Sequence, residues 1–411
     1  MVDTLEVFSI FMLISATILL GYLGNLFYDK TKVPDLIWLL GFGIILGPVF
    51  HLYDPAPFIE ISTLMSAVAL SIILFEAGIT VSIGPVIQAI PKAMALIGFT
   101  FTLTVISVGY FLHFYMPEDF TLLQGFLLGT MVGGTSTVTT IGILHALEST
   151  LDISDVKILL TLESVLTDPI CIIAAITLIQ MILLPSVSFS EGVLDIIIAF
   201  IISSVIGFFI GVVWALILNI LRGKPLKYMI TIAVLFATYM FSDKMGGHGA
   251  GPMAALVFGL VLSNFRYIFR FLGKDMNIKI DRRELIHFHE EVTFFIKSFF
   301  FVYVGLILTV SSKHVVTGFI LIGICLTVRF FSASMASIVM KFSRVERALS
   351  RFIFAHGLPA LIMSQLPSLY DPKRQYFPAP EIYSNLCFII VLGTVLYGAV
   401  VGPLIVKRRI A

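Results

Sequence analysis

The chain has 411 residues, of which 58% are hydrophobic and only 12% are charged, whereas soluble domains carry about 25% charged residues. With a mean hydropathy of +1.05, it has too few polar side chains to cover its own surface, which excludes a soluble protein and indicates an integral membrane protein. The 26 basic and 25 acidic residues nearly cancel, so we expect no nucleic-acid partner.

Apolar stretches follow one another along the whole chain. Most of them have about 17–28 residues, enough to cross the roughly 30 Å of bilayer hydrocarbon as a helix. We therefore predict an all-α polytopic membrane protein with thirteen transmembrane helices. The predicted spans, in chain order, are 5–27, 34–50, 60–82, 93–115, 120–146, 157–182, 193–220, 228–243, 250–264, 287–310, 315–341, 351–368 and 383–405.

The basic residues of the connections predict the orientation of these spans. If the N-terminus lies outside and the spans alternate, 20 Lys and Arg residues fall on the inner side and 4 on the outer side, with Lys297 and Arg329 left inside spans, which accounts for all 26. We therefore expect a multi-pass protein of the cell membrane with its C-terminus in the cytoplasm. The longest polar connection, 265–286, leaves no room for a soluble domain.

An odd number of spans permits an inverted repeat, with spans 1–6 and 8–13 related to each other and joined by span 7. Unusual sequences occur at matching positions of the two halves. The fifth span contains the polar run from Gly133 to Thr140, and the twelfth contains Ala355-His356-Gly357-Leu358-Pro359. Irregular backbone in a membrane survives only where protein buries it or where it lines a cavity. We predict that both helices are broken.

Asp168 is the most informative of the ionisable residues inside the spans, where a buried charge is costly and indicates function. At 100° per residue, Thr161 and Ser164 share one helix face with Asp168. Pro169 removes a backbone N–H and frees the carbonyl of Val165. A carboxylate, hydroxyls and free carbonyls suit a partly dehydrated monovalent cation, which we predict at Asp168.

Two further acidic residues lie in the spans. Glu163 faces away from Asp168, and we predict a structural ion pair between Glu163 and Arg329. Glu76 has three open interpretations: a cation ligand, a proton relay, or the partner of Lys297.

Enzyme and resident-metal chemistry have little support. The run His287-x-His289-Glu290-Glu291 lacks the HExxH order, and its acids suit the amino end of the helix that we predict to begin there. A Gly-x-Ser-x-Gly elbow is also missing from the sequence. We expect no enzyme, no cofactor, and no metal beyond a transported monovalent cation.

With these residues identified, the chain resembles the sodium/proton antiporters of the monovalent cation–proton antiporter superfamily, NhaP-type branch. The resemblance covers essentially the whole length. It is carried by Leu74-Phe75-Glu76-Ala77-Gly78, by Glu163-Ser164 through Asp168-Pro169, by residues 299–305, by Arg329, and by His356-Gly357-Leu358-Pro359-Ala360.

The resemblance implies a homodimer in the lipid bilayer that exchanges Na⁺ or K⁺ for H⁺. It implies an interface domain at 1–92, continued at 183–310 with the linker helix, and a core transport domain at 93–182 and 311–411. In that core the broken fifth and twelfth spans would cross each other near the midplane of the membrane. By position, Asp168 matches the family's ion-binding aspartate. The other matches are Ser164 and Thr135 to oxygen ligands, Glu76 to an acidic ligand, and Glu163 with Arg329 to a stabilising ion pair.

The chain departs from the family pattern around the site. The run Thr135-Ser136-Thr137 lacks the usual carboxylate of the fifth span, and Thr167 replaces the usual Asn. We expect Ser136, Thr137 and Thr167 to support the site. His356 replaces an Arg, so His356, together with Lys297, is a candidate for pH modulation.

The predicted function is electroneutral exchange of one Na⁺ for one proton, in which cation and proton compete for Asp168. With either ligand bound the site is nearly neutral and can be carried across the membrane by alternating access. The first alternative is K⁺/H⁺ exchange by the same machinery, because potassium-transporting relatives also have Ser/Thr-rich fifth spans. A cation channel is the second alternative.

Overall fold

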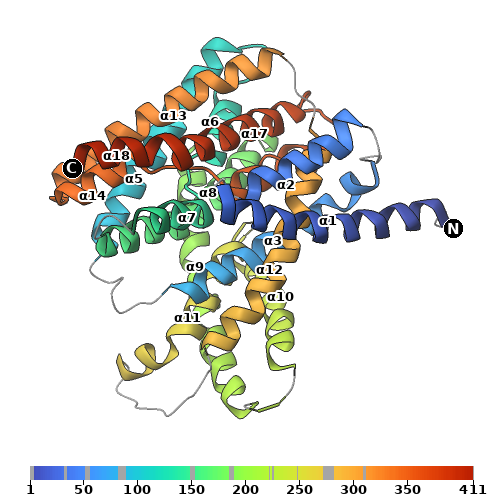
Figure 1. The fold of residues 1–411 in the computed structure, drawn as a ribbon, viewed down its shortest axis with the longest axis vertical. Coiled ribbons are helices and arrows are strands. Elements are labelled where there is room, and N and C mark those ends of the chain that lie inside the picture. The colour runs from blue at the N-terminus through green and yellow to red at the C-terminus, as the bar shows by residue number, and fades with distance from the viewer. Residues whose placement is uncertain are drawn as a thin grey trace.

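The computed structural model describes residues 4–31, 35–50, 56–81, 89–148, 153–184, 189–221, 223–224, 226–247, 249–271, 282–308 and 312–410, and all regular structure within these ranges is helical (Figure 1). The first part of the chain forms α1 (Thr4–Thr31), α2 (Asp35–Ile44) with its π-helical continuation η1 (Ile45–Val49), α3 (Ala56–Thr80), α5 (Ile90–Tyr115), α6 (Leu122–Met131), α7 (Thr137–Glu148), α8 (Ser154–Leu183) and α9 (Phe189–Ile220). The second part forms α10 (Lys227–Gly246), α11 (Gly251–Phe271), α12 (Arg282–Leu306), α13 (Ser312–Val339), α14 (Arg344–Phe352), α15 (Leu358–Met363), α16 (Leu366–Tyr370), α17 (Glu381–Leu396), η2 (Tyr397–Val401) and α18 (Gly402–Ile410).

Six of the described helices are long and apolar enough to cross a membrane: α5, α8, α9, α11, α13 and the continuous helix from α17 into α18. Four shorter apolar helical segments lie in α1, in α2 with η1, in α3 and in α6. The chain is therefore a polytopic, all-helical membrane protein, as predicted. Every predicted span overlaps a described helix, although the number that cross a membrane stays a prediction.

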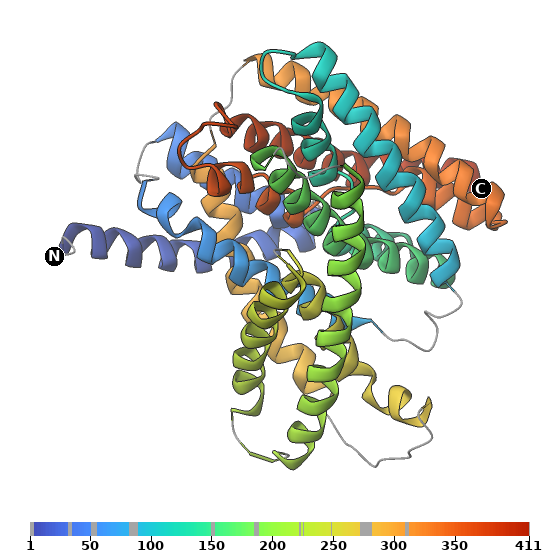
Figure 2. The same cartoon turned by 180° about the vertical axis from the view of Figure 1, so that it is seen from behind.

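The helices pack in two groups. One contains α1–α3 and α9–α12, in which α11 packs closely on α3 and α9. The other contains α5–α8 and α13–α18, in which α5 packs on α6 and α13. In Figures 1 and 2, α5, α6, α13 and α17 lie at the top, whereas α9–α11 extend to the bottom. α8 joins the groups, and it is the most deeply buried of the six long apolar helices.

Both predicted helix breaks are present, and they meet. α6 ends at Met131 and α7 begins at Thr137, while α14 ends at Phe352 and α15 begins at Leu358. Between the breaks, the Ser136 N–H donates a hydrogen bond to the Ala355 carbonyl (2.8 Å). Each break leaves backbone N–H and C=O groups without helical partners, and inside a membrane such groups need other hydrogen-bond partners. The other break supplies part of them.

The close approach of the breaks depends on a glycine. A Cβ on Gly357 would lie 2.4 Å from Ser136 Oγ, which is far inside van der Waals contact. A larger residue at position 357 would push the two breaks apart. The sequence His356-Gly357-Leu358-Pro359 therefore supplies both the crossing and a proline in the first turn of α15.

Helices extend into the predicted polar connection 265–286 from both sides. α11 bends at Asn264, whose backbone is non-helical (φ −113°, ψ 18°), and continues to Phe271. α12 begins at Arg282, where an Nη2 group donates to the Ile79 and Thr80 carbonyls at the end of α3 (3.3 and 2.8 Å). Carbonyls in the last turn of a helix have no partner within that helix, so Arg282, the first residue of α12, caps the C-terminal end of α3.

Candidate functional site

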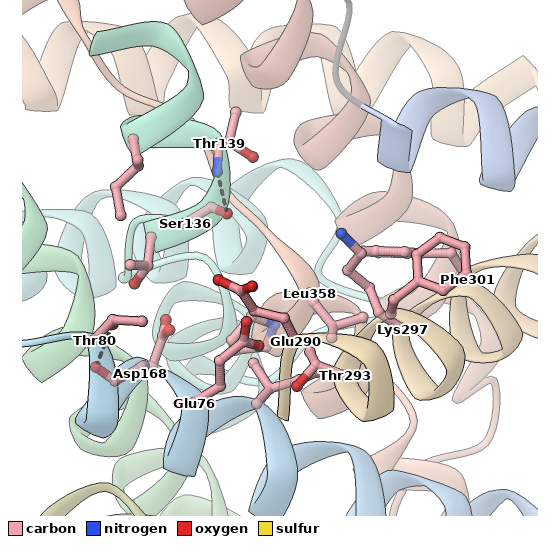
Figure 3. Close-up of a pocket in the computed structure, with 16 residues that line it drawn as sticks. Glu76, Thr80, Ser136, Thr139, Asp168, Glu290, Thr293, Lys297, Phe301 and Leu358 are labelled. Carbon is pink, nitrogen blue, oxygen red and sulfur yellow. Dashed lines mark hydrogen bonds between the residues drawn. The ribbon is translucent and has the colours of Figure 1, made fainter. Parts of the chain in front are cut away.

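A cavity of about 290 Å³ lies between the two helix groups (Figure 3). Its walls come from α3, the α6–α7 break, α8, α12 and the first turn of α15. Four charged side chains line it: Glu76, Asp168, Glu290 and Lys297. The cavity therefore contains two of the predicted site acids and a third that the sequence analysis assigned elsewhere.

Asp168 has the surroundings of an ion-binding group. It lies in the middle of α8, is 7% exposed, and lines the cavity. Its carboxylate accepts no hydrogen bond from any residue that the structure describes. A buried carboxylate without donors is costly to keep ionised unless a cation or a proton neutralises it.

The predicted oxygen ligands Thr135 and Ser164 lie beside the cavity rather than in its lining. Their hydroxyls are hydrogen-bonded to each other (2.8 Å), and both residues are buried. Thr167 joins them, because its hydroxyl accepts the Thr135 N–H (3.4 Å) and lies within hydrogen-bond distance of the Glu163 and Ser164 carbonyls (3.0 and 3.1 Å). These three side chains attach the α6–α7 break to α8, so they hold the break next to Asp168.

Two threonine hydroxyls in the cavity lining have no partner among the described residues. Ser136, Thr137 and Thr293 all line the cavity. The buried Oγ1 atoms of Thr137 and Thr293 make no hydrogen bond with any described residue, whereas Ser136 Oγ accepts the Thr139 N–H (3.3 Å). Unpartnered hydroxyl oxygens beside carboxylates are a suitable environment for a hard monovalent cation.

Glu76 and Lys297 line the same cavity from α3 and α12. The two side chains are of opposite charge, and the Thr293 hydroxyl lies beside Glu76 without forming a hydrogen bond of normal geometry. The position of Glu76 in the wall suits both a ligand and an ion-pair role.

Glu290 is the charged residue of the cavity lining that the sequence pattern did not single out. The prediction that His287 through Glu291 open a helix is wrong, because α12 begins at Arg282 and Glu290 lies more than two turns inside it. A signal was present in the sequence. Glu290, Thr293 and Lys297 are spaced i, i+3 and i+7, which places them on one helix face.

Glu163 and Arg329 form a buried ion pair beneath the site. Both guanidinium ends bond the two carboxylate oxygens, with Arg329 Nη2 to Glu163 Oε2 at 2.9 Å. Arg329 Nε also donates to the Ser350 carbonyl (2.6 Å). The pair therefore connects α8, α13 and α14, and neither residue is part of the cavity lining.

His356 lies at the crossing of the two breaks and is fully buried. Its Nε2–H donates to the Val132 carbonyl at the end of α6 (2.6 Å), and its backbone N–H donates to Thr394 Oγ1 (3.1 Å). Its Nδ1 also lies 3.1 Å from Thr394 Oγ1. His356 thus ties α6, α15 and α17 together, and its part in pH modulation stays a prediction.

The chain matches a known family of membrane transporters. The sequence profile described as sodium/hydrogen exchanger, transmembrane, matches residues 15–407. The chain belongs to the sodium/hydrogen exchanger family. Members of this family are transporters rather than enzymes, and the predicted NhaP-type resemblance is confirmed.

Named relatives in this family include both sodium and potassium antiporters. The chain is 23% identical over 299 residues to Na(+)/H(+) antiporter 1 of Methanocaldococcus jannaschii, covering 72% of this chain and 67% of that protein. It is 25% identical over 382 residues to K(+)/H(+) antiporter NhaP2 of Shewanella sp. strain ANA-3, covering 90% of this chain and 61% of that protein. The chain thus spans less than two thirds of the length of this potassium antiporter.

Solved structures share the fold of this exchanger-family chain. The structure of the sodium proton antiporter MjNhaP1 from Methanocaldococcus jannaschii at pH 8 superimposes with a TM-score of 0.81 at 20% identity, covering 98% of this chain and all of that one. A structure of MjNhaP1 from an electron-microscopy map gives a TM-score of 0.71 at 19% identity, with 96% of each chain covered.

Proposed function

We propose that the chain is a secondary antiporter that exchanges Na⁺ for H⁺ across the cell membrane. The observation that carries the proposal is Asp168, a buried carboxylate that lines a cavity and accepts no hydrogen bond from the described residues. Membership of the sodium/hydrogen exchanger family supports the same activity. Glu76 is the second acidic ligand, and the break around Thr135 and Ser136 supplies oxygens.

In this proposal the coupling follows from competition. A cation and a proton each neutralise the Asp168 carboxylate, so only one of them is bound at a time. An empty, charged site is costly to move through the membrane, whereas a site with either ligand is nearly neutral. Each cycle then carries one cation one way and one proton the other way, without net charge.

The cavity between the two helix groups supports alternating access. α3 and α12 form one wall, and α8, the α6–α7 break and α15 form the other. We assign the second group to a mobile core and the first to an interface domain in a homodimer. On this proposal thirteen spans, with inverted repeats at 1–6 and 8–13, place the N-terminus outside and the C-terminus in the cytoplasm.

Potassium is the second candidate cation. The run Thr135-Ser136-Thr137 brings no carboxylate to the helix break, which leaves fewer charges to strip water from the smaller, more strongly hydrated Na⁺. The named relatives include a K(+)/H(+) antiporter as well as a Na(+)/H(+) antiporter. Either cation fits the proposed competition at Asp168.

The test is proton flux in vesicles that contain the purified chain, with Na⁺ or K⁺ added in turn. We expect one or both cations to drive proton movement. Asp168→Asn should abolish it, because a neutral amide neither takes up a proton nor attracts a cation with a negative charge. Asp155→Asn is the matched control, since Asp155 is exposed in the first turn of the same helix. Cation-driven flux that persists in Asp168→Asn would contradict the proposal.

A further inference from the structure

A polar face of α12 borders the cavity, and the exchange proposed at Asp168 does not account for it. It consists of Glu290, Thr293 and Lys297, and all three side chains line the cavity (Figure 3). Across from them lies Glu76 of α3, and the carboxylates of Glu76 and Glu290 both point into the cavity in Figure 3. With both carboxylates ionised, Glu76, Glu290 and Lys297 carry one net negative charge.

Exposure along α12 places these residues at different depths. Glu290 is exposed, Thr293 is 6% exposed, and Phe300 two turns further on is fully buried. Asp168, from the opposite wall, is as buried as Thr293. Glu290 therefore lies at the mouth of the cavity, and Thr293 lies between the mouth and its interior.

The hydroxyl of Thr293 is the second observation that indicates a ligand here. It lies beside the Glu76 carboxylate, but Oγ1 makes no hydrogen bond of normal distance and angle with any residue that the structure describes. Leaving a buried hydroxyl without a partner costs free energy unless something else binds it. A neutral oxygen beside a carboxylate, in a cavity that a second carboxylate also lines, suits a partly hydrated monovalent cation.

We propose that Glu290 and Thr293, facing Glu76, form an outer cation station through which Na⁺ or K⁺ passes on its way to Asp168. The inference rests on the proposed antiport function and adds a second binding position to it. Negative charge at the mouth of a low-dielectric cavity raises the local concentration of cations. Glu290 then affects how readily a cation enters, and Asp168 carries the coupling to protons.

The decisive experiment removes the Asp168 carboxylate and asks whether cation binding remains. In Asp168→Asn, we expect NaCl or KCl to raise the melting temperature of the purified protein above its value in N-methyl-D-glucamine chloride of equal ionic strength. Adding Glu290→Gln or Thr293→Val should remove that rise. Adding Glu291→Gln should leave the rise in melting temperature unchanged. Glu291 is exposed, its Oε1 lies 3.6 Å from His287 Nδ1, and it does not line the cavity.

Transport provides the second readout, in the chain with Asp168 intact. Glu290→Gln should raise the KM for the cation about three- to tenfold at low ionic strength, with the maximal rate unchanged. Glu290→Asp keeps the negative charge and should bring the KM most of the way back to that of the unmodified chain. The Thr293→Val variant covers the case in which Glu290→Gln does not fold.

The outcomes separate the two proposals. If the unmodified chain shows no cation-driven proton flux, the proposed function itself fails. If it transports, the station is overturned by any of three results: no cation-dependent rise in Asp168→Asn, a rise that survives Glu290→Gln, or equal KM values for Glu290→Gln and Glu291→Gln.

Discussion

Asp168 and Glu163 are both buried carboxylates on α8, and their surroundings assign them different roles. Glu163 is matched by a guanidinium with two parallel contacts, so its charge is permanently compensated. Asp168 faces a cavity with no donor from the described residues, so its compensation must come from a ligand. Two carboxylates five residues apart on one helix therefore differ in role: Glu163 is held in a structural ion pair, and Asp168 depends on a ligand that can exchange.

This difference predicts the behaviour of Glu163 variants. Glu163→Gln leaves Arg329 buried without its carboxylate, and we expect it to destabilise the protein by about 3–5 kcal/mol. The double variant Glu163→Leu/Arg329→Met removes both charges and should recover much of that loss, as measured by thermal unfolding in detergent. If Glu163→Gln were at least as stable as the double variant, the ion pair would not be structural.

At the level of elements, the position of α3 decides where Glu76 lies. Gly78 allows α3 to approach α11 closely, since a Cβ at this position would lie 2.2 Å from the Leu256 carbonyl oxygen. Gly259 of α11 makes the reciprocal contact, because its Cβ would lie 2.4 Å from the Phe75 carbonyl oxygen. Backbone meets backbone here, so no side chain can rotate away to make room.

The contact predicts that Gly78→Ala destabilises the protein by about 1–3 kcal/mol through overpacking. It should also lower transport, because α3 must shift and takes Glu76 with it. Gly98→Ala in α5 is the control: a Cβ there meets nothing within 4 Å, and alanine favours a helix by about 1 kcal/mol. Equal melting temperatures for the two variants would contradict the close packing of α3 on α11.

The sequence predicts the elements of this protein better than the detailed contacts of its site. Carboxylates are so costly in apolar spans that the residue pattern alone singles out Glu76 and Asp168, and both line the cavity. Glu290 is not singled out in this way, because an acid near a polar interface fits a helix terminus equally well. Helical periodicity places Ser164 on the face of Asp168, but the hydrogen bond from its hydroxyl to Thr135 depends on tertiary packing that periodicity does not contain.

At the scale of the whole molecule, the cavity lies where the two helix groups meet, and each group supplies one acid of the predicted site. Asp168 belongs to the group with both broken helices, and Glu76 belongs to the group with α1 and α9. Movement of one group against the other would therefore change both access to Asp168 and its distance from Glu76. Exposed apolar side chains on α1, such as Phe11, Leu19 and Tyr22, suit lipid or a second copy of the chain.

The central claim is that cation and proton compete for one site, and the pH dependence of the KM for the transported cation tests it most directly. We would measure cation-driven proton flux in vesicles at a series of pH values. Competition predicts that, on the acidic side, the KM rises about tenfold for each unit by which the pH falls, while the maximal rate stays constant. A KM independent of pH, with a maximal rate that falls instead, would contradict the account.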